Sequence, residues 1–97
     1  MKIVYIETTI VSYLVANPTR NLIAASRQQT TRDWWQFRQG LYQCVTSDET
    51  LAQTDYLLTW NCRHLANEQI LRRLARGAEH SGWKLPRVCT PLELMID

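Results

Sequence analysis

Short apolar runs alternate with helix-like segments along the chain, and this alternation predicts an α/β fold. Residues 2–6, KIVYI, are β-branched and apolar on both faces, which is typical of a strand that is covered on both sides. Residues 41–46, 56–60 and 87–89 are three further runs of strand length. Strands that alternate with helices favour a parallel sheet.

Capping residues and helical spacing predict the first two helices. Thr8 and Thr9 can cap a short helix, IVSYLV, which stops before the turn at Asn17-Pro18. A longer helix is predicted over residues 20–38, with a stop at Gly40. Its apolar side is formed by positions that recur at helical spacing, namely Ile23, Thr30, Trp34, Phe37 and Leu41.

Two more helices are predicted after Asn61. The first has one apolar face and ends between Gly77 and Gly82, and the apolar positions are Leu65, Ile70, Leu71, Leu74, Ala75 and Ala78. The second follows strand 87–89, where Thr90 caps, Pro91 takes the first helical position and Glu93 completes a capping box.

The connection between the second and third strands is unusually short. Only nine residues, SDETLAQTD, lie between them, whereas a crossover between parallel strands takes at least about 10–12 residues including its helix. Three explanations are open. The two strands pair differently, residues 48–54 form a cramped helical turn, or the chain derives from a longer one that has lost its middle.

Composition indicates one small globular domain that spans residues 1–97. Hydrophobic residues make up 45% of the chain, and no apolar run approaches the roughly 18 residues that a membrane span needs. No secretory signal is recognisable, so we expect a cytoplasmic protein without membrane contact. Three cysteines without CxxC spacing, Cys44, Cys62 and Cys89, suggest small buried side chains and neither disulfides nor a zinc site.

The net charge of +2 is too small to indicate a partner, but the arginines are unevenly distributed. Four of them cluster in one predicted helical region, namely Arg63, Arg72, Arg73 and Arg76. They form either a solvated helix face or a contact surface for RNA or another phosphate ligand. Trp34 falls on the apolar stripe and is predicted to lie in the core, whereas Trp35 is a candidate for partner contact.

Two long stretches of the chain resemble the ends of a PIN-domain protein. These are residues 1–35, which begin MKIVYIETT, and DYLLTWNCRHLANEQI, which is followed by VCTPLELM. The PIN domain is the metal-dependent ribonuclease fold of VapC-like toxins. The resemblance implies an α/β/α sandwich in which acidic residues at the ends of parallel strands hold Mg²⁺ or Mn²⁺. It also implies RNA as substrate and an antitoxin-like protein as partner.

Two strand ends carry the candidate site, and we expect strands 2–6 and 56–60 to be parallel neighbours because both are apolar throughout. Glu7 follows strand 2–6 and is the first candidate metal ligand, although the family usually has Asp there. The alternative is that Glu7 only stabilises the N-terminus of the next helix. Asn61 ends strand 56–60, where many relatives carry Asp, and its neutral amide would bind metal weakly but can orient water or phosphate. A turn or helix cap is the alternative for Asn61.

The other acids of the family pattern are not matched. The segment TSDETLAQ has Gln53 where the family has a metal-binding Glu, and the helices that carry a further Asp have no counterpart between about residues 53 and 55. Asp48 and Glu49 lie nearby but on the wrong side of the turn to be presumed substitutes. Together with Asp55 they are the alternative metal-binding group only if activity does not depend on Glu7. We therefore expect a PIN-like domain that is truncated in the middle.

Other chemistry has less support in the sequence. Cys62 and His64 are close in sequence, but a nucleophilic pair must also be close in space, and His80 sits among polar residues at a helix end. Two functions remain open: a PIN-like endoribonuclease with weak or no activity, and a non-catalytic remnant that binds an antitoxin-like protein or RNA. Because the covering helices are missing, we also expect one face or edge of the sheet to be exposed, and therefore a homo-oligomer.

Overall fold

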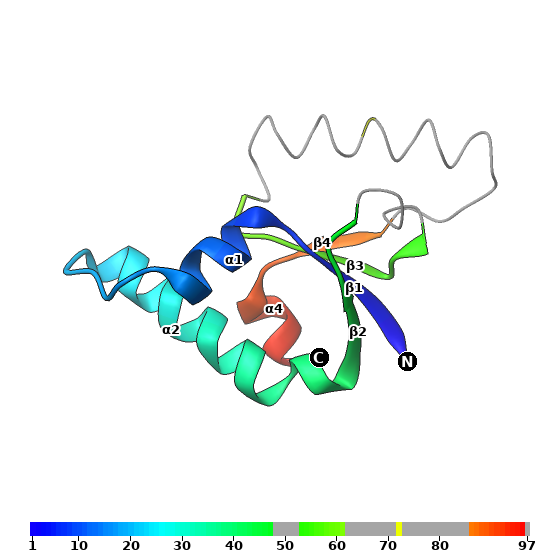
Figure 1. The fold of residues 1–97 in the computed structure, drawn as a ribbon, viewed down its shortest axis with the longest axis horizontal. Coiled ribbons are helices and arrows are strands. Elements are labelled where there is room, and N and C mark those ends of the chain that lie inside the picture. The colour runs from blue at the N-terminus through cyan, green and yellow to red at the C-terminus, as the bar shows by residue number, and fades with distance from the viewer. Residues whose placement is uncertain (48–52, 62–71, 73–85, 97) are drawn as a thin grey trace.

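Four parallel strands form a single sheet in the computed structural model, which describes residues 1–47, 53–61, 72 and 86–96. The strands are β1 (Lys2–Ile6), β2 (Tyr42–Val45), β3 (Tyr56–Leu58) and β4 (Arg87–Cys89). Their order in the sheet is β2-β1-β3-β4, and each neighbouring pair is parallel (Figure 1). The expected α/β class with a parallel sheet is therefore confirmed.

Strand β1 lies between the two strands whose short connection was unexpected. Val4 is paired with Cys44 of β2 on one side and with Tyr56 of β3 on the other. β2 and β3 are thus parallel to each other but are not neighbours, because β1 lies between them. The proposed helical turn at residues 48–54 falls mostly outside the described residues.

β1 and β4 have the bounds predicted from the sequence, whereas β2 and β3 are shorter than predicted. Leu41 belongs to a 3₁₀ turn, η1 (Gln39–Leu41), and not to β2. β3 ends at Leu58 although a strand was predicted to residue 60. The reason is local, because the Trp60 N–H bonds to the side-chain oxygen of Thr9 and not to a neighbouring strand (3.0 Å).

Three helices are described beside the sheet, namely α1 (Thr8–Val15), α2 (Leu22–Phe37) and α4 (Pro91–Ile96). The N-cap of α1 is Glu7, so the predicted caps Thr8 and Thr9 were wrong. The predicted capping box of α4 is confirmed, since Thr90 N–H donates to Glu93 Oε1 (3.1 Å) and Glu93 N–H donates to Thr90 Oγ1 (3.2 Å).

The hydrophobic core lies on the side of the sheet where α1, α2 and α4 pack (Figure 1). Every second strand position faces these helices, and the buried core consists of Val4, Ile6, Ile10, Trp34, Leu58, Cys89 and Leu94. The alternate positions Tyr5 and Leu57 face the opposite side and are buried as well. Both faces of the central strands are therefore covered, as their continuous apolar pattern predicted, and the expected exposure of a sheet face is not found at these strands.

The buried side of α2 differs from the predicted apolar stripe. Trp34 is fully buried as expected and Trp35 is 39% exposed, but Ile23 and Phe37 are 68% and 64% exposed. Leu41, the last residue of that stripe, lies beyond the helix and is exposed too.

Two polar residues, Gln28 and Thr31, are buried beside Trp34 in place of that stripe. Gln28 Nε2 donates to the carbonyls of Ala16 (2.8 Å) and Tyr13 (3.3 Å) at the end of α1, and Thr31 Oγ1 accepts from Trp60 Nε1 (2.7 Å). Tertiary hydrogen bonds make the burial of these two side chains possible, and a hydrophobic pattern does not contain that information.

The cysteines and the predicted helix after Asn61 are only partly within the described residues. Cys89 is buried and Cys44 is half-buried, whereas Cys62 lies outside the described residues. The predicted helix after Asn61 also lies outside them, except for Arg72, whose side chain is exposed. Within the described part of the chain, no helix has the length and apolar character to cross a membrane.

Candidate functional site at the ends of β1 and β3

The chain reverses its direction of sheet growth at β1, because β2 is added on one side of it and β3 on the other. In parallel α/β sheets, ligands bind in the crevice at the carboxyl ends of the two strands that flank such a switch point. Here these strands are β1 and β3, as predicted for the runs 2–6 and 56–60. Glu7 follows β1 and its N–H donates to the Leu58 carbonyl of β3 (3.1 Å), so the two strand ends meet.

The Glu7 carboxylate is the centre of a hydrogen-bond network at this edge. Its Oε2 accepts from Thr9 N–H (3.0 Å), from Thr9 Oγ1 and from Thr59 Oγ1 (2.7 Å). Its Oε1 accepts from Thr8 Oγ1 (2.9 Å). The carboxylate thereby caps α1 and also ties the first turn of α1 to the end of β3.

Thr9 and Thr59 link the carboxylate to the backbone that follows β3. Thr9 Oγ1 accepts from Trp60 N–H (3.0 Å), and Thr59 Oγ1 accepts from Asn61 N–H (3.0 Å). Each hydroxyl therefore accepts from a backbone amide and donates to Glu7, which is the arrangement in which chained hydrogen bonds strengthen one another. Asn61 is half-buried, and its backbone N–H is linked to the Glu7 carboxylate through the Thr59 hydroxyl.

Two opposing effects act on the pKa of Glu7. Partial burial of the carboxylate raises its pKa, but the hydrogen bonds from Thr9, Thr59 and Thr8 together outweigh this effect. The net pKa is lower than the ordinary value of a glutamate, so the carboxylate is ionised at neutral pH. Glu7 thus offers a negative charge to the crevice, although protein donors already occupy much of its hydrogen-bonding capacity.

The donors at this edge suit a divalent cation in type but not in number. Carboxylate, hydroxyl and amide oxygens are the ligands that Mg²⁺ and Mn²⁺ prefer. Glu7 is one carboxylate, however, and an ion would compete with the hydroxyl groups of Thr9 and Thr59 for Oε2. Among the described residues, no group of three or more His, Cys, Asp or Glu side chains is placed to hold a metal ion. The residues described here fit one weakly held ion and do not fit a two-ion centre.

The other predicted acids do not join Glu7 in the described structure. Asp55 precedes β3 and therefore lies at the amino ends of the strands, opposite to Glu7, where its Oδ2 accepts from Ile3 N–H (2.7 Å). Gln53 is exposed and lies two residues before Asp55. Asp48 and Glu49 lie outside the described residues, as do the pair Cys62 and His64, and His80.

Sequence reasoning missed the two threonines that hold Glu7. Thr9 was assigned only a capping role, and Thr59 was treated as a strand residue, although it is fully buried and donates to Glu7. One signal could have found them. A hydroxyl residue lies shortly after each of the two neighbouring parallel strands, and a single acid, Glu7, lies next to them. Such hydroxyls are the natural donors to a carboxylate that must be partly buried.

No protein-family model, no curated protein and no solved structure matches this chain.

Proposed function

We propose that the chain is a PIN-like domain of the kind found in metal-dependent toxin ribonucleases, with weak or no nuclease activity as it stands. The observation that carries this proposal is the position of Glu7 and Asn61. They follow β1 and β3 at the switch point of a parallel sheet, and Thr59 connects them. The order of the segments that resemble PIN domains, with the ending VCTPLELM, supports the same assignment.

Within this proposal, Glu7 is the anionic ligand for one Mg²⁺ or Mn²⁺ ion. A divalent ion at this position would activate a water molecule and offset charge on the cleaved RNA phosphate. Thr9 and Thr59 fix the position and rotamer of Glu7, and Asn61 orients water or a phosphate oxygen with its amide. Because one carboxylate supplies little charge to such a site, we expect weak binding of the ion and feeble hydrolysis.

The second candidate is a non-catalytic domain that binds RNA or an antitoxin-like protein. It is favoured by the state of Glu7, whose carboxylate is engaged as a cap and a tie between strands. Exposed apolar side chains on the helices also favour a protein partner, and they include Val15 and Phe37. A cytoplasmic location and a truncated α/β/α sandwich belong to both candidates.

A calorimetric titration with Mn²⁺ distinguishes the two candidates. The wild-type chain should bind about one ion weakly, Glu7→Gln should abolish binding, and Asn61→Asp should tighten it by adding a charged oxygen ligand. Glu93→Gln is the matched control, because Glu93 is also a capping glutamate but lies at α4. Wild-type heats equal to those of Glu7→Gln, with both chains folded, would favour the non-catalytic candidate.

A further inference from the structure

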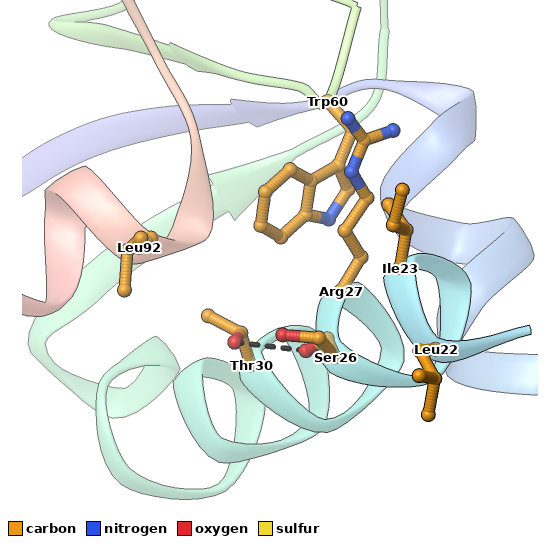
Figure 2. A pocket seen from close by; sticks show the side chains of 7 residues that line it. All are labelled: Leu22, Ile23, Ser26, Arg27, Thr30, Trp60 and Leu92. Atoms are coloured by element: carbon orange, nitrogen blue, oxygen red, sulfur yellow. Dashed lines mark hydrogen bonds between the residues drawn. The ribbon is translucent and has the colours of Figure 1, made fainter.

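An open pocket lies beside the candidate site, on the helix side of the sheet. Its volume is about 330 Å³, at the lower end of the range for small-molecule sites in proteins. It is lined by residues from α2, from the loop after β3 and from α4, namely Leu22, Ile23, Ser26, Arg27, Thr30, Trp60 and Leu92. Figure 2 shows the Trp60 indole between Leu92 and the side chain of Arg27.

The Trp60 indole is held in place by contacts with Thr31 and Tyr13. Its Nε1–H donates to Thr31 Oγ1 (2.7 Å), and the rings of Trp60 and Tyr13 are in a T-shaped arrangement, with 6.3 Å between the ring centroids. These contacts fix the plane of the indole before any ligand arrives. A fixed aromatic ring is a stacking platform for a planar ligand, because binding then costs little side-chain entropy.

Arg27 places a positive charge at the same pocket. Its guanidinium lies over the face of the Trp60 ring, with 5.4 Å between the guanidinium carbon and the ring centroid, and its side chain is exposed. A base that stacks on this face must therefore displace the guanidinium toward the rim of the ring. No acidic side chain in the described parts of the chain forms an ion pair with it. An unpaired guanidinium next to an aromatic face suits a ligand that has both a planar ring and an anionic group.

Trp60 connects the pocket to the candidate site through its neighbours in the sequence and through a hydrogen bond. Trp60 stands between Thr59 and Asn61, and its N–H bonds to Thr9 Oγ1, which in turn donates to Glu7. Ser26 and Thr30 line the pocket across from the indole (Figure 2). The Thr30 hydroxyl already donates to the Ser26 carbonyl (3.0 Å) and can only accept from the edge of a base, whereas the Ser26 hydroxyl can donate or accept. A nucleotide at Trp60 would therefore lie next to the crevice that holds Glu7.

We propose that this pocket binds a nucleotide whose base stacks on Trp60 and whose phosphate pairs with Arg27. The inference rests on the proposed function in one respect, because RNA is the expected source of the nucleotide; a free nucleotide has the same chemistry. Stacking does not distinguish the bases strongly, so the pocket accepts all four, with purines preferred for their larger ring surface.

The test is a titration of the ¹⁵N-labelled chain, without metal, with adenosine 5′-monophosphate, adenosine or octa-adenylate RNA. The Trp60 Nε1–H signal is assigned by its loss in Trp60→Phe, which keeps an aromatic ring in the core. The monophosphate should shift this signal, and Arg27→Gln should weaken its binding about tenfold. Adenosine should bind Arg27→Gln and wild type alike. Arg32→Gln, which removes an exposed arginine of α2 that does not line the pocket, should change nothing.

The outcomes separate the possible occupants. Tighter binding of the octanucleotide than of the monophosphate assigns the pocket to an RNA strand, and equal binding assigns it to a free nucleotide. Indole is the probe for an apolar partner side chain, and if it binds as tightly as the monophosphate, the proposal is overturned. The absence of any shift with nucleotide or RNA would also overturn it. Because metal is absent, failure of the metal site does not affect this result.

Discussion

The Glu7 carboxylate joins three parts of the chain: the end of β1, the first turn of α1 and the loop after β3. Its hydrogen bonds to Thr8, Thr9 and Thr59 account for its lowered pKa despite partial burial. The same contacts make Glu7 important for stability whether or not it also binds metal. Stability measurements on this residue therefore test the local geometry independently of function.

Replacement of Glu7 by Gln should destabilise the fold by about 1–3 kcal/mol, because a neutral amide accepts fewer and weaker hydrogen bonds from the hydroxyls. Urea unfolding at neutral pH measures this cost. The control Glu93→Gln should cost less, since Glu93 accepts one backbone hydrogen bond in an exposed capping box. Equal costs for the two variants would contradict the network at Glu7.

The contribution of Glu7 should also depend on pH. Its pKa is lower in the folded chain than in the unfolded chain, so the unfolded state binds more protons when the solution becomes acidic. The stabilisation is complete above the ordinary carboxyl pKa and is lost as the pH falls through the folded value. In urea unfolding between about pH 6 and pH 3, the difference between wild type and Glu7→Gln should shrink. A difference that is constant over this range would show that the Glu7 pKa is not lowered.

Among the elements, the strands were more predictable than the orientation of α2. β1 and β4 have the predicted bounds because their apolar, β-branched pattern depends on local properties. The buried face of α2 was predicted wrongly because Gln28 and Thr31 are buried through hydrogen bonds to distant segments. Similarly, the position of Glu7 at a strand end was predictable, whereas the role of its partner Thr59 depends on where β3 ends, two residues earlier than predicted.

The two adjacent tryptophans of α2 provide a test of its orientation. Trp34 is fully buried in the core and stacks on Tyr42, with 5.8 Å between ring centroids, whereas Trp35 is 39% exposed. Trp34→Ala should therefore destabilise the chain by about 3–5 kcal/mol, and Trp35→Ala by less than about 1 kcal/mol. Urea unfolding monitored by circular dichroism measures both. If the two variants cost the same, α2 is rotated relative to this description.

At the scale of the whole molecule, the sheet order places β1 at the centre and β3 beside it, and this order creates the candidate site. Large apolar side chains are exposed on α1 and α2, including Val15, Leu22 and Phe37. Exposed apolar surface of this kind usually finds a partner. We therefore predict a homodimer or larger assembly in light scattering at micromolar concentration. A monodisperse monomer that unfolds cooperatively would contradict this prediction.

Cleavage of a fluorogenic single-stranded RNA in the presence of Mn²⁺ tests the central claim most directly. We predict feeble cleavage by the wild-type chain, none by Glu7→Gln, and faster cleavage by Asn61→Asp, which adds a second carboxylate beside Glu7. Circular dichroism confirms that each variant is folded. Robust Mn²⁺-dependent cleavage that survives Glu7→Gln would contradict the placement of the site at β1 and β3, and would direct attention to Asp48, Glu49 and Asp55.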